Sequence, residues 1–253
     1  MPKHLIAFQR SAATDPDTFQ PMLCIADSVL AQASTTAFFV KAGMRAVAGY
    51  IGSNGTAPKI EGARINSPTF RRVGLPNIRP MNGQLLAGDD PNVMVIVDRP
   101  LDYPDIDTLS IEIINSGATP DAVALLWLET DVEPVPPGDT FWLRYTSTSS
   151  ASALAWTPIV IDFEQLPEGE YIVCGMEHVS LTCLAARLVI PGSPWRPGTL
   201  GQNDLTNQNH AVFYDDRLGV FGRFNAFAPP TVEVLCTGTD SEHVGFLRVL
   251  RVK

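Results

Sequence analysis

The chain has 253 residues, of which 45% are hydrophobic and 18% are charged, and its formal net charge is -9. This composition is typical of a globular protein, although charged residues are fewer than usual. The acidic balance, without a basic stripe, argues against a protein whose main task is to neutralise the phosphates of nucleic acid. The length is sufficient for two domains that each bury a core.

The first stretch, residues 1–23, lacks sustained hydrophobic periodicity and predicts an extended N-terminal arm. Such arms often drape over neighbouring subunits, and a frayed terminus is the alternative. The stretch also lacks the apolar run of a signal peptide, and no segment approaches the roughly 18 continuous apolar residues that span a bilayer. We therefore expect a protein that is made and assembled in a cytoplasm.

Residues 24–130 predict a first domain built of strands. Short apolar or alternating runs are bounded there by Gly, Pro, Asn and Asp. Residues 109–113 alternate, so one face of that strand should point inward. Residues 93–97 and 122–128 are continuously apolar and are expected to be buried on both faces. Helical patterns are scarce, with two possible turns at residues 26–34.

The prolines Pro134, Pro136 and Pro137, followed by Gly138, interrupt the strand pattern and predict a stiff connector at residues 131–140. The second domain, residues 141–253, resumes with strands around a Ser/Thr-rich loop. Its least strand-like part is residues 191–209, a long loop where specialised contacts are expected. A second short helical pattern lies at residues 205–213.

The second half of the chain repeats the first in three blocks that keep their order. Loops of unequal length separate the blocks, as in duplicated folds that have drifted. The paired positions are Gly43, Val47 and Gly49 with Gly169, Val173 and Gly175; Ala63 to Ile65 with Ala186 to Leu188; Ser67, Pro68, Phe70 and Arg71 with Ser193, Pro194, Trp195 and Arg196; and Ile111 to Leu126 with Val232 to Leu247. The alternative is that any two strand-rich stretches share such a pattern.

The repeat, the many strands and the lack of helical crossovers together predict an all-β fold. We expect two tandem antiparallel jelly-roll (Greek-key) sandwiches related by internal duplication.

No motif in the chain indicates catalysis. The sequence has no GxSxG, no HExxH, no Walker-type phosphate loop and no dinucleotide fingerprint. The adjacent acidic pairs at residues 89–90 and 215–216 fit solvated turns better than calcium loops. We therefore predict a protein that is not an enzyme and has no catalytic, cofactor-binding or metal residue.

The histidines and cysteines are scattered. His4, His178, His210 and His243 occur singly, and a bicupin metal site would need an HxH pair that the chain lacks. The cysteines show no CxxC spacing and no nearby His, so neither a zinc site nor a redox pair is indicated, while a disulfide stays open. They are Cys24, Cys174, Cys183 and Cys236, of which Cys174 and Cys236 are predicted to be small buried hydrophobes.

The aromatic residues keep a sugar-binding function open. A carbohydrate groove needs several aromatic rings on one exposed face. The candidates are Phe70, Trp127, Trp142, Tyr145, Trp156 and Trp195, although Trp127 lies in a run that predicts core.

The repeated blocks, the stiff connector, the acidic charge and the lack of a catalytic signature resemble the double jelly-roll major capsid proteins of tailless icosahedral viruses. The resemblance is one of pattern and covers most of the chain. It implies a structural virion protein whose homotrimers, pseudo-hexagonal in outline, tile an icosahedral shell after assembly in the host cytoplasm. The partners that it implies are other copies of the chain, minor capsid proteins or an internal membrane, without cofactors or sequence-specific nucleic acid binding.

In this interpretation the arm and the loop at residues 191–209 are candidate interface elements. Deletion of residues 1–20 is then expected to leave a folded protein but to impair assembly. The alternative function is a two-domain β-sandwich binding module for carbohydrate or host attachment, and a β-sandwich hydrolase has the weakest support.

Overall fold

A computed structural model describes residues 3–10, 18–53, 60–71, 77–78, 94–95, 101–103, 105–115, 122–130, 133–201 and 219–252. Over these residues the protein is all-β with several antiparallel sheets, which confirms the predicted class. The one helical element described is the single turn α1 (Pro68–Arg71). It is far too short to cross a membrane, and no other described segment is a candidate helical span. The helical pattern at residues 26–34 was wrong, because bends and the short strand β4 (Gln32–Ser34) occupy it. The pattern at residues 205–213 lies outside the described residues.

The chain divides into two compact units. Residues 6–128 form the N-terminal unit, and residues 129–253 together with residues 1–5 form the C-terminal unit. The predicted connector at residues 131–140, described from residue 133, belongs to the C-terminal unit. There the Val220 backbone N–H donates to the Glu133 carbonyl, and a Cβ at Gly138 would lie 2.6 Å from Leu250 Cδ1.

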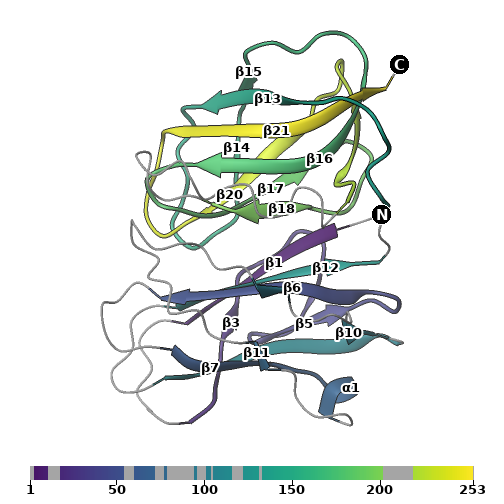
Figure 1. Ribbon diagram of the computed structural model, residues 1–253. Coiled ribbons are helices and arrows are strands. Elements are labelled where there is room, and N and C mark those ends of the chain that lie inside the picture. The colour runs from purple at the N-terminus through teal and green to yellow at the C-terminus, as the bar shows by residue number, and fades with distance from the viewer. Residues whose placement is uncertain are drawn as a thin grey trace. The chain divides into compact units, whose positions relative to one another are not determined.

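Two sheets make up the N-terminal unit (Figure 1). The first has the order β10 (Leu101–Asp102), β6 (Arg45–Ser53), β12 (Ala122–Glu129), β1 (Lys3–Arg10) and β3 (Leu23–Cys24), with β9 (Met94–Val95) also paired to β6. The second has the order β4, β5 (Ala37–Val40), β11 (Asp107–Asn115), β7 (Ile60–Asn66) and β8 (Asn77–Ile78), with β2 (Gln20–Pro21) also paired to β11.

The burial of these strands follows their sequence pattern. On β11, Leu109, Ile111 and Ile113 are buried while Ser110 and Glu112 are partly exposed, as the alternation predicted. Every residue of β12 is buried, which confirms the interpretation of residues 122–128. The predicted strand at residues 93–97 is described only at β9, where it pairs with β6.

The C-terminal unit also has two sheets (Figure 1). The first has the order β15 (Asp162–Phe163), β13 (Thr140–Ser147), β21 (His243–Val252), β16 (Glu170–Val179) and β19 (Gly222–Asn225). The second has the order β14 (Thr157–Ile159), β20 (Thr231–Cys236), β17 (Cys183–Val189) and β18 (Gly198–Leu200).

Apart from β4, β5 and β9, which have no counterpart, the strand order of the N-terminal unit matches that of the C-terminal unit. The order β10-β6-β12-β1-β3 corresponds to β19-β16-β21-β13-β15, and β2-β11-β7-β8 corresponds to β14-β20-β17-β18. The three repeated blocks of the sequence lie on corresponding strands, namely β6 and β16, β7 and β17, and the pairs β11–β12 and β20–β21. The glycines that open the first block, Gly43 and Gly169, both have a positive φ, a backbone conformation that residues with a side chain rarely adopt.

The N-terminus differs from the expected free arm. Residues 3–10 form β1, which is hydrogen-bonded between β12 and β3, and its first six residues are buried. The physical reason is the short apolar run after His4, which supplies a buried strand despite its polar surroundings. In the C-terminal unit, buried Lys3 places its Nζ 4.0 Å from Glu129 Oε2 and 5.7 Å from the centre of the Phe221 ring. Residues 11–17 of the predicted arm lie outside the described residues.

Candidate functional site

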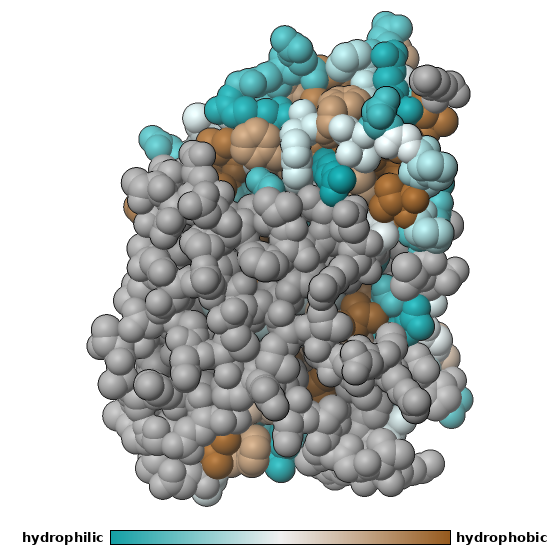
Figure 2. Space-filling view, in the orientation of Figure 1, coloured by the Kyte–Doolittle hydropathy of each residue, from teal (hydrophilic) through white to brown (hydrophobic). Residues whose placement is uncertain are grey.

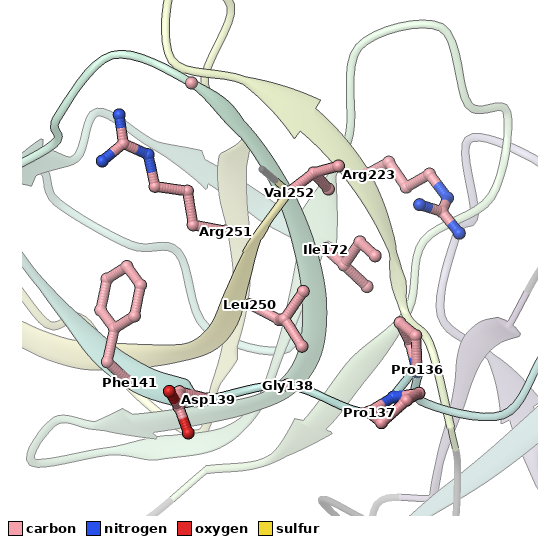
Figure 3. Close-up of a pocket in the computed structure, with 11 residues that line it drawn as sticks. Pro136, Pro137, Gly138, Asp139, Phe141, Ile172, Arg223, Leu250, Arg251 and Val252 are labelled. Atoms are coloured by element: carbon pink, nitrogen blue, oxygen red, sulfur yellow. The ribbon is translucent and has the colours of Figure 1, made fainter.

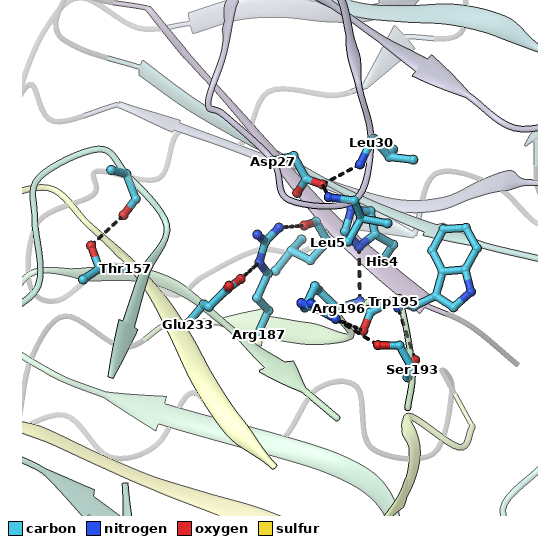
Figure 4. A network of polar contacts seen from close by, with 12 residues as sticks. His4, Leu5, Asp27, Leu30, Thr157, Arg187, Ser193, Trp195, Arg196 and Glu233 are labelled. Carbon is cyan, nitrogen blue, oxygen red and sulfur yellow. Dashed lines mark hydrogen bonds and ion pairs between the residues drawn. The ribbon is translucent and has the colours of Figure 1, made fainter. Parts of the chain in front are cut away.

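A buried arginine and a glutamate form an ion pair across the second sheet of the C-terminal unit (Figure 4), and an aromatic ring lies over the arginine. Arg187 on β17 and Glu233 on β20 are direct cross-strand partners, with Arg187 Nε 2.7 Å from Glu233 Oε2. The guanidinium lies 4.1 Å from the centre of the Trp156 ring and donates from Nη1 to the Leu5 carbonyl at 3.1 Å. The Arg187 side chain is only 1% exposed, so these contacts must replace its hydration.

The N-terminal unit holds the same cluster at the corresponding positions. Arg64 on β7 faces Glu112 on β11, with 2.6 Å between Arg64 Nε and Glu112 Oε2. The Arg64 guanidinium lies 3.9 Å from the centre of the Phe19 ring. Each ring also occupies the same register, since the residue two positions after it, Pro21 or Pro158, pairs with the glutamate. Arg64 is 29% exposed, so this copy is the more hydrated of the two.

The start of β1 binds the loop at residues 191–197 within the C-terminal unit (Figure 4). The Leu5 backbone N–H donates to the Arg196 carbonyl at 2.9 Å, and the Arg196 backbone N–H donates to His4 Nδ1 at 3.2 Å. The His4 ring meets the edge of Trp195 at 5.9 Å between centroids. This part of the predicted contact loop therefore binds residues of its own chain. Residues 202–209 of that loop lie outside the described residues.

A chain of buried polar groups joins β13, β16 and β21. The Tyr145 hydroxyl lies 2.8 Å from His178 Nδ1, His178 Nε2 lies 3.3 Å from His243 Nδ1, and His243 Nε2 lies 3.2 Å from the Ser149 carbonyl. Because a carbonyl only accepts, His243 Nε2 carries the proton, and its Nδ1 then accepts from His178 Nε2. His178 Nδ1 in turn accepts from the Tyr145 hydroxyl. Every donor in this relay meets an acceptor when both rings are neutral.

The surroundings favour that neutral state. Burial, reinforced by the neighbouring His243, lowers the pKa of His178 to about 3. Burial also lowers the pKa of His243, although Asp240 opposes the shift. Burial alone would raise the pKa of Asp240, but hydrogen bonds from Thr182 and from the Glu242 backbone N–H hold it below its usual range. The relay is therefore a structural element that resists protonation.

The relay does not form a metal site, because the ring nitrogens of the two histidines are hydrogen-bonded to each other, to Tyr145 and to the Ser149 carbonyl. Among the described residues, no group of three His, Cys, Asp or Glu side chains could hold a metal ion. His210 and the acidic pairs at residues 89–90 and 215–216 lie outside the described residues. The absence of catalytic, cofactor and metal residues stays a prediction.

An open groove of about 940 Å³ crosses the C-terminal unit at the connector (Figure 3). Ile172 and Leu250 form its apolar floor, and the guanidinium groups of Arg223 and Arg251 lie on opposite sides. Arg223 is paired with Glu133, and Arg251 donates to the Glu168 carbonyl. The rest of the lining consists of Pro136, Pro137, Gly138, Asp139, Phe141, Gly169 and Val252. Arginine, proline and aromatic side chains around an apolar floor suit a protein contact.

The four tryptophans have different surroundings. Trp127 is buried, as predicted. In the C-terminal unit Trp156 packs on Arg187 and Trp195 on His4, whereas Trp142 is 41% exposed and meets Phe246 edge to face. Figure 2 shows hydrophobic and hydrophilic side chains interspersed over the coloured part of this unit. Tyr145 is fully buried, and the Phe70 side chain lies outside the described residues.

All four cysteines are free thiols, and Cys174 and Cys236 are buried as expected. Sequence reasoning missed the pairing of Cys183 with Cys236 and of His178 with His243, because both arise from strand register. Comparison with family models, with curated proteins and with solved structures gives no match to this chain.

Proposed function

We propose that the chain is a major capsid protein, a structural virion protein built of two jelly-roll sandwiches that descend from one duplicated ancestor. In this proposal it forms homotrimers of pseudo-hexagonal outline that tile an icosahedral shell. The trimers assemble in the host cytoplasm, bind neighbouring capsomers, and meet minor capsid proteins or an internal membrane. The protein has no catalytic role.

The observation that carries the proposal is the repeated strand order. Along the N-terminal unit, β1, β6, β10 and β12 belong to one sheet and β2, β7, β8 and β11 to the other. Along the C-terminal unit, β13, β16, β19 and β21 belong to one sheet and β14, β17, β18 and β20 to the other. With β4, β5 and β9 set aside, the chain visits the two sheets of each unit in the same sequence, and this order supports the double Greek-key pattern of a jelly roll.

The side chains give independent support to the duplication. Each unit has an arginine–glutamate ion pair on corresponding strands, Arg64 with Glu112 and Arg187 with Glu233. In both units the two residues are direct cross-strand partners, and an aromatic ring lies over the guanidinium. A shared strand order alone is weaker support, because sandwiches have few topologies and unrelated ones can have the same order. A charged pair with its aromatic cover, repeated in register, is much better explained by common descent.

A doubled sandwich suits a shell because a threefold arrangement of two similar units presents six similar edges. One subunit type can then contact neighbours on all sides, and each contact can be weak because there are many. The groove with its arginines and Phe141, and the exposed apolar side chains of the C-terminal unit, are available for such contacts. The most exposed of these are Val160, Leu181 and Phe227.

The test is a mass measurement in solution, followed by electron microscopy of the concentrated protein. The proposal predicts a species with three times the 27.4 kDa chain mass, and hexagonal outlines or closed particles at high concentration. A chain that stays monomeric at every concentration and never forms ordered arrays would contradict it. The full chain should be used, because β1 is part of the fold.

A second candidate function is a binding module for carbohydrate or host attachment, and one observation favours it. Trp142 is exposed on β13 beside Phe246, and exposed aromatic rings are the usual platform for sugars. A glycan array with the wild-type chain and with Trp142→Ala separates the functions. Binding that is lost in the variant would favour attachment, whereas trimers without glycan binding favour the shell protein.

A further inference from the structure

Two thiols face each other at one end of the second sheet of the C-terminal unit. Cys183 is the first residue of β17 and Cys236 the last of β20, and they are direct cross-strand partners. Both side chains are almost completely buried. The pairing of the two strands continues from Ala185 with Leu235 to Val189 with Thr231, so the sheet holds the cysteines opposite each other.

The geometry requires only a small approach for a covalent bond. Cβ atoms of direct antiparallel partners lie about 4.5–5.5 Å apart, whereas a disulfide needs about 3.5–4.5 Å. The register shifts between Cys183 and Ala185, so the ladder is irregular where the approach must occur. The pairing is regular from Ala185 to Val189 and irregular at Cys183. The end of the strand can therefore move enough for the two sulfurs to bond while the rest of the sheet stays in place.

The environment gives the two sulfurs different roles. A hydrogen bond from Cys183 lowers the pKa of the Cys236 thiol, and Thr182 and Ser180 reinforce the effect against burial. Burial raises the pKa of the Cys183 thiol well above its usual value. Cys236 is therefore the thiol that ionises more readily, whereas the Cys183 thiol donates to the Ala185 carbonyl at 3.5 Å.

A surface hollow lies near this pair of thiols. The hollow has a volume of about 430 Å³ and is lined by Leu181, Thr239 and Asp240, among others. Asp240 accepts hydrogen bonds from Thr182 and acts electrostatically on both thiols, so the inner wall of the hollow adjoins them.

We propose that Cys183 and Cys236 form an intramolecular disulfide on exposure to a hydroperoxide. The Cys236 thiolate attacks the O–O bond of the peroxide, so that an S–O bond forms and the leaving oxygen departs as water after taking a proton. The Cys183 sulfur then attacks the Cys236 sulfenic acid, loses its proton, and releases a second water as the S–S bond forms. The two thiols give up two electrons, and one hydrogen peroxide becomes two waters.

The consequence is a cross-link whose state follows the compartment. In a reducing cytoplasm the pair stays as thiols, whereas outside the cell it closes and fixes β17 to β20. Cross-strand disulfides that require a backbone approach are easily reduced, so the bond is reversible. This inference does not depend on the proposed function.

The test uses the full chain, freed of reductant, treated with hydrogen peroxide, then denatured in iodoacetamide and digested for mass spectrometry. We expect a linked peptide pair containing Cys183 and Cys236, a loss of two hydrogens, and alkylated Cys24 and Cys174. Cys174 is the internal control, because it is equally buried and its thiol donates to the Arg248 carbonyl. Alkylation of all four cysteines, or a link through Cys24 or Cys174, would overturn the proposal.

Single variants separate the two roles. In Cys183→Ser the sulfenic acid on Cys236 should persist and react with dimedone, whereas in Cys236→Ser Cys183 should stay unmodified. Cys174→Ser should leave the link intact. Should a cysteine variant fail to fold, as circular dichroism would reveal, the mapping of the wild-type chain still decides the question.

Discussion

The buried ion pair of the C-terminal unit allows a graded test of the structure. In Glu233→Ala, Arg187 loses its carboxylate partner but keeps the Leu5 carbonyl and the face of Trp156. Breaking a buried pair by removing one partner costs about 3–5 kcal/mol in the free energy of unfolding. The two remaining contacts place Glu233→Ala near the lower end, at about 3 kcal/mol.

The N-terminal unit supplies the matched control. Glu112→Ala removes the corresponding carboxylate, but the Arg64 side chain is 29% exposed against 1% for Arg187. Water can therefore solvate the Arg64 guanidinium once its partner is gone. The expected cost is about 1 kcal/mol, as for partly exposed pairs.

Hydrogen exchange measured by mass spectrometry can follow each unit separately. In Glu233→Ala the slowest amides of β17 and β20 should exchange about a hundredfold faster, since about 1.4 kcal/mol corresponds to a factor of ten. In Glu112→Ala the amides of β7 and β11 should accelerate less than about tenfold. Equal acceleration in the two variants, or none in β17, would refute the reasoning. The double variant Arg187→Met/Glu233→Leu should recover most of the free energy of unfolding in urea melts, because no unpaired charge stays buried.

Three further predictions concern the same folds. The folded pKa of His178, about 3, lies below its usual 6.5, so the relay's stability is complete above pH 6.5 and is lost as the pH falls toward 3. Urea melts at pH 7.5 and 5 should show this loss, and His178→Gln should flatten it if the relay is its source. Deletion of residues 1–20 should prevent folding, contrary to the sequence-based expectation. The deletion removes three large buried apolar side chains of β1, which stabilise the fold by about 5–9 kcal/mol. A truncated protein that is soluble and melts cooperatively would contradict this prediction. Gly245→Ala should destabilise the C-terminal unit by about 1–3 kcal/mol in thermal melts, because the added methyl group overlaps the Tyr145 ring, and an unchanged melting temperature would argue against that close approach.

The sequence was sufficient for the parts of the fold that depend on local pattern. The alternation along residues 109–113 and the continuous apolar run at residues 122–128 predicted one-sided and two-sided burial, and both are observed. The paired blocks also fall on or beside strands that hold the same places in the two strand orders. The charged cluster was within reach of the same comparison, because Arg64 and Arg187 lie in one block and Glu112 and Glu233 are aligned in another.

The sequence was insufficient where function depends on register across distant strands. His178 and His243 are 65 residues apart, and only the pairing of β16 with β21 brings their rings together. Cys183 and Cys236 meet in the same way across β17 and β20. A one-residue slip would send each side chain to the opposite face, so the spacing of the residues along the chain contains no signal for either pair. The strand β1 was missed because its apolar run is short and is flanked by polar residues.

The recurrence of the ion pair indicates what it does for the fold. A buried ion pair adds little stability over an apolar pair of the same size, so stability alone does not explain why both units have one. Register does explain it, because in each unit the arginine and the glutamate are direct partners on the two strands whose alignment sets the second sheet. A slip of one strand by one residue would turn its charge to the opposite face and leave the other charge without its partner, a cost that an apolar pair does not have. We infer that the cluster selects the correct strand alignment in each unit. A double variant with apolar residues should therefore remain stable while losing the single, well-protected register that hydrogen exchange reports.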